Sequence, residues 1–263
     1  MTRHNTSPVH FVAEIRIDTI DRKALLAKLM LHIGSAGGAA ELEVVHTINP
    51  EICMHAWRNP EYRRTLNAGT ANVVDGVGLQ LALQRVTRRK VQRTCGADLI
   101  FDLAEITRRA GRTLVLLGGS PSRVEKACVH LEQRFPGLRV VGCSPPYGSS
   151  LPLSNQEDVQ QLIMREQPAV LAVCLGAPKQ ELWIQSNKNF LRLHDVRVAA
   201  GLGGTIDFLS GEVPRAPILW RNLGLEWFYR LCIEPKRWKR QISTLPKFAA
   251  LALFDRTFIR QGR

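Results

Sequence analysis

Polar residues follow several short apolar runs in this 263-residue chain, and Asp75 is the clearest case. It ends the run 72–74 and is followed by Gly76-Val77-Gly78. A carboxylate beside glycines can approach a ligand closely, and it could serve as a general base, a metal ligand or a ribose contact. An aspartate before glycine is also common in ordinary turns, so both interpretations stay open.

Thr47 and Asn49 offer hydrogen-bonding groups at the end of the apolar run 43–48. Asparagine followed by proline is typical of a helix start, in which Asn49 caps the first turn and Pro50 is the first helical residue. For Asn49 alone, the cap is the favoured interpretation. At a strand-to-helix junction, the same side chains could also contact a ligand.

Two glycine turns follow other apolar runs: Gly118-Gly119 after 114–117, and Gly201, Gly203 and Gly204 after 196–200. Small residues before a helix expose backbone N–H groups to a phosphate, although each turn could also be purely structural. The second turn resembles a dinucleotide fingerprint, but Ile206 stands where the third glycine belongs. It is therefore weak evidence for a nicotinamide cofactor.

Lys179 and Gln180 follow Pro178 in the predicted first turn of a helix. The helix macrodipole disfavours a lysine at this end, so an anionic ligand explains Lys179 better than helix stability does. The alternative is a solvated lysine beside a capping glutamate. No Asp-x-Asp pair, HExxH motif, P-loop or GxSxG motif occurs, so a metal-bridged diphosphate site has no obvious ligands.

Short apolar strands alternate with helices along the chain and must position these residues. This pattern predicts an α/β fold with a Rossmann-like, mostly parallel sheet covered by helices on both faces. Ligands of such sheets bind at the carboxyl ends of the strands. The predicted strands are 9–17, 43–48, 72–74, 113–117, 138–143, 170–175 and 196–200, and the predicted helices are 25–33, 50–57, 79–86, 97–110, 122–135, 156–165 and 180–191.

Residues 211–263 carry eleven Lys and Arg against four acids, and they hold three of the five tryptophans. The formal net charge of +13 predicts an anionic partner, and arginine mixed with tryptophan suits anionic head groups beside an apolar phase. We therefore expect a catalytic core at 1–210 and a membrane-associating C-terminal appendage at 211–263. The change in charge and the nearby Pro214 and Pro217 place the boundary near Gly211.

The six cysteines are scattered and form no CxxC pair, which favours buried free thiols in a reducing compartment. The first residues show no signal peptide, and no apolar run approaches the length needed to span a bilayer. We expect a peripheral protein on the cytoplasmic side.

Taken in order, these junctions resemble the WecG/TagA/CpsF glycosyltransferase family over nearly the full chain. The resemblance is carried by Thr47-Ile48-Asn49, Val74 to Gly78, Arg93 to Leu99, Leu117-Gly118-Gly119, Leu175 to Glu181, Gly201 to Gly204, Arg215-Ala216-Pro217, Gly224 to Leu231 and Glu234 to Arg237. The Pro-Lys-Gln-Glu block and the last two blocks are the specific ones.

The resemblance implies an inverting, metal-independent transferase without cofactor, acting in bacterial surface polysaccharide synthesis. It would move an N-acetylmannosamine-type sugar, its uronic acid or a related hexose from a UDP donor to a polyprenyl-diphosphate-linked acceptor. Asp75 would be the general base, and Thr47, Arg93 and Gln180 would line the site. Homo-oligomers also occur in the family. Such chemistry needs one base and, without a metal, positive charge that stabilises the departing UDP.

The resemblance also implies that the appendage docks on the anionic cytoplasmic face of the inner membrane and closes over the site with arginines. The candidates for the lipid diphosphate or the membrane are Arg215, Arg221, Arg230, Arg237 and Arg240. From Pro246 a last helix is predicted, with Leu251, Phe254 and Phe258 on one side. It would lie in the membrane interface, or pack on the core or a sister subunit.

Two other functions compete on the same residues. An NAD(P)-dependent oxidoreductase suits the fold, but the incomplete glycine fingerprint argues against it. A nucleic-acid-binding protein suits the charge, with tryptophans as stacking platforms, but no recognised motif supports it.

Overall fold

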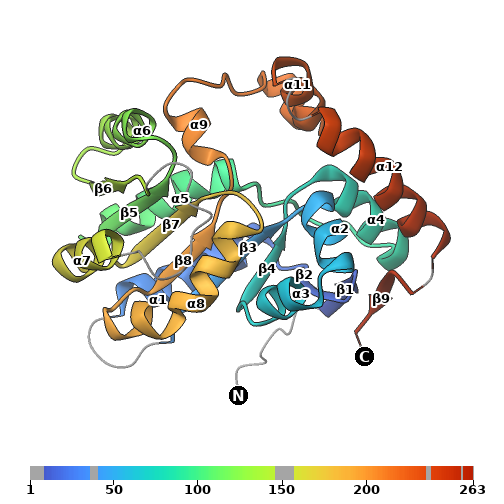
Figure 1. Ribbon diagram of the computed structural model, residues 1–263, viewed down its shortest axis with the longest axis horizontal. Helices are drawn as coiled ribbons and strands as arrows, with labels where there is room; N and C mark the ends of the chain where they lie inside the picture. Colours follow the sequence, from blue (N-terminus) through green and yellow to red (C-terminus); the bar gives the residue numbers. More distant parts are fainter. Residues whose placement is uncertain (1–8, 36–40, 146–156, 235–237, 256, 263) are drawn as a thin grey trace. The chain divides into compact units, whose positions relative to one another are not determined.

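The computed structural model describes residues 9–35, 41–145, 157–234, 238–255 and 257–262, and gives only the backbone of Asn222, Lys239 and Arg240 (Figure 1). The chain divides into two compact units. Unit 1 comprises 1–22, 47–95 and 215–263, and unit 2 comprises 23–46 and 96–214. The predicted boundary near residue 211 lies close to the last crossing between the units, whereas the division into a core 1–210 and an appendage 211–263 stays a prediction.

Within the described residues the sheet has nine strands, most of them parallel, and it confirms the predicted α/β class. Their order is β6 (Arg139–Cys143), β5 (Thr113–Gly118), β7 (Val170–Cys174), β8 (Val198–Gly201), β3 (Glu43–Ile48), β4 (Ala71–Val74), β2 (Ile15–Asp18), β1 (Val9–Val12) and β9 (Ile259–Gln261). Helices flank the sheet (Figure 1). Its central strands are short, apolar and fully buried, as expected for parallel strands covered on both faces.

Unit 2 places the carboxyl ends of β5, β7 and β8 at one edge, because these strands are parallel and in register. Val170 pairs with Leu114 on one side and with Val198 on the other. Trp183 and Ile184 of one helix pack with Val115, Leu171 and other apolar residues in the core. The helices of this unit are α1 (Arg22–Gly34), α5 (Gly96–Arg109), α6 (Pro121–Arg134), α7 (Glu157–Glu166), α8 (Lys179–Leu193) and α9 (Thr205–Leu209).

Unit 1 begins with a hairpin where a single strand over 9–17 was predicted. Ala13 and Glu14 have φ values of 53° and 59°, so the chain reverses between β1 and β2. A two-residue hairpin turn of type I′ needs positive φ at both central residues, and Asn-Gly, the usual sequence signal for it, is lacking here. β2 then pairs in parallel with β4, and β9 pairs antiparallel with β1.

The helices of unit 1 are α2 (Pro50–Arg58), α3 (Pro60–Asn67), α4 (Val77–Thr87), α10 (Ile218–Asn222), α11 (Glu226–Ile233) and α12 (Trp238–Phe254). Asn49 and Asn59 cap α2 and α3 in the same way, with proline following each cap. The Asn49 Oδ1 atom accepts the Ile52 N–H at 3.0 Å, which confirms the predicted cap. The second Asn-Pro pair was an equal signal, and α3 was missed.

The last helix differs from its prediction at both ends. α12 starts at Trp238, contains Pro246 and ends at Phe254, so Phe258 lies beyond it. Phe258 is fully buried against Phe248 and Trp57, because β9 pairs with β1 and brings the intervening turn inward. Phe254 is 85% exposed. The predicted common face is therefore wrong, and α12 packs on α2 and α4, as Figure 1 shows.

Two further features concern the whole described chain. None of its helices is both long and apolar enough to cross a membrane. The cysteines are free thiols, and Cys53, Cys95 and Cys174 are buried, as expected, while Cys232 is exposed.

Candidate functional site

Asp75 directly follows β4 in unit 1, where main-chain hydrogen bonds fix it. The Asp75 N–H donates to the Ile48 carbonyl at 2.8 Å, and the Thr94 N–H donates to the Val74 carbonyl at 2.7 Å. Gly76 is required here, because a Cβ at this position would lie 2.7 Å from Cδ of Pro50. The partly buried carboxylate thus stands between the ends of β3 and β4 and the segment 91–95.

Cys95 contacts this carboxylate, and the sequence analysis did not identify it as a site residue. Burial is the main cause that raises the pKa of the Cys95 thiol; the Asp75 charge and a hydrogen bond to the Asp75 side chain raise it further. The positive charge of Arg93 lowers the pKa of the thiol, but by less than burial raises it. The thiol therefore stays protonated and remains a hydrogen-bond donor. In the sequence, the feature that could have pointed to Cys95 was its place in the block Arg93 to Leu99.

Arginine and glutamate side chains of unit 1 join this group. Nη2 of Arg93 donates to the Arg221 carbonyl at 3.4 Å, so Arg93 contacts α10. Glu226 lies 3.6 Å from Nε of Arg215, and its charge also acts on the Cys95 thiol. The structure thus brings Asp75, Arg93 and Arg215 together and adds Cys95 and Glu226, which had not been predicted as site residues. These five residues are called the unit 1 cluster below.

The remaining predicted arginines have different surroundings. Arg230 pairs with Glu234 one turn along α11, at 2.8 Å. Arg221 is partly buried in α10. Arg237 lies outside the described residues, and the structure gives no side-chain position for Arg240. Thr47 is buried at the end of β3, and Asn49 acts as the α2 cap described above.

The glycine turn after β5 in unit 2 is tightly packed. Gly118 and Gly119 have φ values of +136° and +69°. A Cβ at Gly118 would lie 2.6 Å from the Cys174 carbonyl oxygen, and a Cβ at Gly119 would lie 2.9 Å from Cγ2 of Ile206. Side chains are therefore excluded from this turn; Gly118 is buried, whereas Gly119 is partly exposed.

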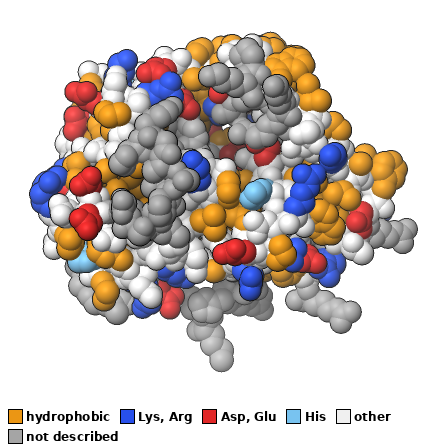
Figure 2. Space-filling model, viewed as in Figure 1, with side chains coloured by type: hydrophobic (Ala, Val, Ile, Leu, Met, Phe, Trp, Pro, Cys, Tyr) orange, Lys and Arg blue, Asp and Glu red, His pale blue; other side chains and the backbone are white. Residues whose placement is uncertain are grey.

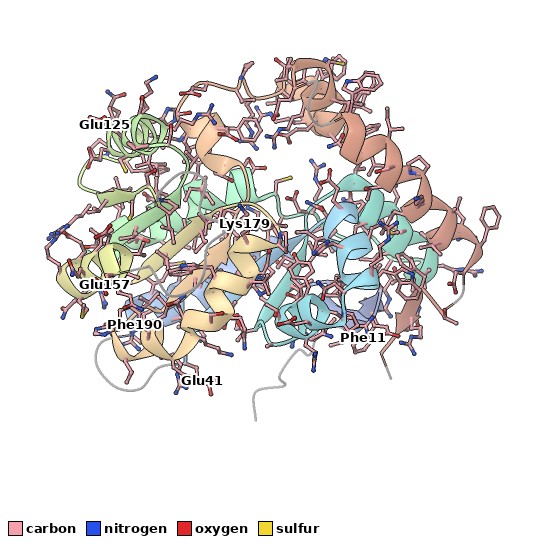
Figure 3. The ribbon with its side chains drawn as sticks, viewed as in Figure 1. Phe11, Glu41, Glu125, Glu157, Lys179 and Phe190 are labelled. Atoms are coloured by element: carbon pink, nitrogen blue, oxygen red, sulfur yellow. The ribbon has the colours of Figure 1, made fainter. Side chains whose placement is uncertain are left out.

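Lys179 and Gln180, adjacent in sequence, have opposite environments. Lys179 is exposed in the first turn of α8, where Figure 3 labels it. Gln180 is only 2% exposed, and its Oε1 accepts the Gly203 N–H at 2.8 Å. Gly201 ends β8 beneath this amide, and Gly204 precedes α9. Gln180 thus holds the second glycine turn.

Arg123 was also not predicted, although it stands in α6 just after the first glycine turn. It pairs with Asp207 at 3.0 Å and with Glu212 at 2.5 Å. Its Cβ lies near Gly119. A basic residue in a first helical turn was the available signal, the same one that identified Lys179.

In the part of the chain that the structure describes, no group of three or more His, Cys, Asp or Glu side chains could hold a metal ion. Metal independence stays a prediction. The charged groups present at the unit 1 cluster are carboxylates and guanidinium groups.

The family model of the WecG/TagA/CpsF glycosyl transferases matches residues 10–262. This chain belongs to that family. It is 33% identical over 211 residues to the N-acetylglucosaminyldiphosphoundecaprenol N-acetyl-beta-D-mannosaminyltransferase of Bacillus subtilis (strain 168), covering 80% of this chain and 78% of the relative. It is 31% identical over 207 residues to the enzyme of the same name from Bacillus spizizenii, covering 79% of this chain and 77% of that relative.

Family membership confirms the resemblance based on the strand-end motifs and makes the protein a glycosyltransferase family enzyme. It favours sugar transfer over the oxidoreductase and nucleic-acid alternatives. The match also includes the C-terminal segment that folds into unit 1.

Proposed function

We propose that this chain is an inverting glycosyltransferase that moves a sugar from a UDP donor to a polyprenyl-diphosphate-linked acceptor, without a metal ion. The observation that carries this proposal is the Asp75 carboxylate, held at the end of β4 beside Arg93 and the Cys95 thiol. Family membership and the names of the relatives support the reaction class.

In this reaction Asp75 is the general base. Its carboxylate takes the proton of the acceptor hydroxyl while the hydroxyl oxygen attacks C1 of the donor sugar from the face opposite the leaving group. The bond between C1 and the diphosphate oxygen breaks, UDP leaves with the electron pair, and the configuration at C1 inverts. A well-placed general base contributes about 10²–10⁴-fold to such a step.

Positive charge and N–H groups must stabilise the departing diphosphate when no metal does so. We assign this role to the backbone of the two glycine turns of unit 2, with Lys179 at the start of α8. The partial exposure of Gly119, Gly203 and Gly204, each shortly before a helix, supports contact of a phosphate with these turns.

The segment 215–254 supplies the contact with the lipid-linked acceptor. It combines the predicted arginines with exposed apolar side chains on α10, α11, α12 and their connections. Figure 2 shows hydrophobic side chains along the edge formed by α11 and α12. The exposed residues are Ile218, Leu219, Leu223, Leu225, Trp227, Phe228, Ile233, Trp238, Ile242, Leu253 and Phe254. We expect them to place the enzyme peripherally on the anionic cytoplasmic face of the inner membrane.

For the sugar, we propose N-acetylmannosamine as the first donor to test and a polyprenyl-diphosphate-linked N-acetylglucosamine as the first acceptor. The names of both relatives describe this transfer. The uronic acid of N-acetylmannosamine and related hexoses are the next donors.

The test is a donor screen against a short-chain polyprenyl-diphosphate N-acetylglucosamine in the presence of a chelator, with products identified by mass spectrometry. We expect one UDP-sugar to give an acceptor that has gained one sugar residue. Loss of turnover in chelator, restored by Mg²⁺ or Mn²⁺, contradicts the metal-independent reaction. Binding of NADH or single-stranded DNA without a response to UDP contradicts the transferase assignment.

A further inference from the structure

Both ends of the Gln180 amide make hydrogen bonds within unit 2. Its Oε1 accepts the Gly203 N–H at 2.8 Å, and its Nε2 donates to Oε1 of Glu181 at 2.7 Å. These partners also fix which end of the amide is oxygen, because a backbone N–H only donates and a carboxylate only accepts. With 2% of its surface exposed, Gln180 has little access to a substrate.

Glu181 is completely buried in the first turn of α8. Burying a carboxylate is costly unless it is hydrogen-bonded, and the N-terminal end of a helix is the favourable end for negative charge. The Gln180 Nε2–H supplies one of its hydrogen bonds. This hydrogen bond anchors the Nε2 end of the Gln180 amide.

Gly201 completes the arrangement, because a Cβ there would lie 3.0 Å from Nε2 and 3.3 Å from Cδ of Gln180. The amide therefore rests directly on the end of β8. Gly203 has a φ of +59°, and a Cβ added to it would meet no atom within 4 Å. The hydrogen bond from the Gly203 N–H to Gln180, and not steric crowding, therefore fixes the position of Gly203.

We propose that Glu181 is a positioning residue that orients the Gln180 amide, and that Gln180 in turn holds the Gly201–Gly204 turn in the shape that accepts the nucleoside diphosphate of the donor. Gln180 then acts through the backbone of Gly203 and does not itself contact the substrate. This inference rests on the proposed function, since the ligand of the turn is the UDP part of the donor.

The test uses three variants of the full-length protein. Gln180→Met removes both hydrogen bonds with little change in volume, Glu181→Leu removes the acceptor of Nε2, and Glu181→Gln keeps an oxygen that can accept. Gln185→Leu, on the exposed side of the same helix, is the control. The measurements are UDP affinity, the KM values for donor and acceptor, and hydrogen exchange of the peptide that contains Gly203.

We expect Gln180→Met and Glu181→Leu to weaken UDP binding about tenfold, the effect expected when a buried hydrogen-bonding group loses its partner. The donor KM rises while the acceptor KM stays unchanged, and Gly203 exchanges faster even without ligand. Glu181→Gln retains most of the affinity, and Gln185→Leu behaves like the wild type. A purely structural role would lower the melting temperature without changing the UDP affinity of the folded protein.

The two proposals fail in different ways. Wild-type protein that binds no UDP contradicts the proposed function. Wild-type binding that Gln180→Met and Glu181→Leu leave unchanged contradicts only the positioning role. Unaltered Gly203 exchange in Gln180→Met also overturns that role, whatever the ligand of the turn proves to be.

Discussion

At the scale of single residues, the unit 1 cluster joins a carboxylate to a thiol that cannot readily ionise. Burial and the Asp75 charge raise the pKa of Cys95, so the thiol donates a hydrogen bond to the Asp75 side chain. Such a bond stabilises the ionised carboxylate, which is the form that a general base needs. We therefore expect Cys95 to assist the general base by donating this hydrogen bond, and not to act as a nucleophile.

Replacing Cys95 tests this support. Cys95→Ala removes the donor, so the carboxylate is harder to ionise and the acid limb of the kcat/KM profile moves to higher pH. Cys95→Ser keeps a donor and leaves the limb near its wild-type position. The measurement is kcat/KM against pH for all three proteins, and an acid limb that does not move in Cys95→Ala contradicts the role of the thiol.

Other buried thiols make the stability of the fold depend on pH. Burial raises the pKa of Cys174 to about 12 from the ordinary 9.0. Because the folded-state pKa is raised, its contribution is complete below pH 9 and is lost as the pH rises from 9 toward 12. The slope is about 1.4 kcal/mol per pH unit for each such thiol.

Urea unfolding under reducing conditions between pH 8 and pH 11 measures this effect. The free energy of unfolding of Cys174→Ala is expected to fall less steeply with pH than that of the wild type. Cys232→Ala, at an exposed position, keeps the wild-type slope. Equal slopes in all three proteins contradict the assignment.

The sequence alone indicated the residues that follow strands, since their place depends on local pattern. Asp75, Gln180 and both glycine turns lie at strand ends as predicted. Cys95, Glu226 and Arg123 were missed because their roles depend on partners distant in the chain: the Arg123 partners, for example, lie 84 and 89 positions further on. Periodicity carries no information about such pairs.

At the scale of elements, the bounds of most predicted strands and helices agree with the structure to within a few residues. The periodicity of apolar residues and the Asn-Pro caps are local signals, so the sequence alone reveals them. The failures depend on tertiary contacts. β1 and β2 separate at a hairpin without a glycine, and Phe258 leaves the predicted helix because β9 pairs with β1. Pro246 was predicted to start a helix, whereas α12 continues through it.

Gly224 offers a test of how the turn after α10 is held in unit 1. Its φ is +73°, and a Cβ would lie 2.9 Å from Cγ2 of Val77 at the start of α4. Val77 is β-branched and cannot easily move aside. Gly224→Ala is therefore expected to destabilise the protein by about 2–3 kcal/mol, combining backbone strain with a steric clash.

Gly137 is the matched control, because its φ is +87° but nothing lies within 4 Å of a Cβ. Gly137→Ala is expected to cost only about 1 kcal/mol, from backbone strain alone. Thermal or urea unfolding measures both. Equal costs for the two substitutions would show that the Val77 contact is unimportant.

At the scale of the whole molecule, the C-terminal segment is part of a folded unit as well as a candidate membrane surface. β9 extends the sheet at β1, α12 packs on α2 and α4, and Arg85 donates to the Ala252 and Leu253 carbonyls at the end of α12. Removing 211–263 would therefore disturb unit 1 itself. Surface substitutions are the better probe of membrane binding.

Leu219→Asp and Leu223→Asp place charges on exposed apolar positions in and after α10. Each is expected to reduce binding to anionic vesicles at least about tenfold, the value of transferring one leucine side chain out of water. Leu193→Asp, at a position in unit 2 that is even more exposed, is the control and keeps full binding. Vesicle sedimentation measures all three, and unchanged binding of both α10 variants contradicts this surface.

The most direct test of the central claim is the turnover of Asp75→Asn, with Asp158→Asn on the exposed face of α7 as the control. The substitution keeps the size of the side chain and removes the base. We predict that UDP affinity and melting temperature stay close to those of the wild type while kcat falls about 10²–10⁴-fold. An Asp75→Asn enzyme that binds UDP and turns over at nearly the wild-type rate would contradict the account.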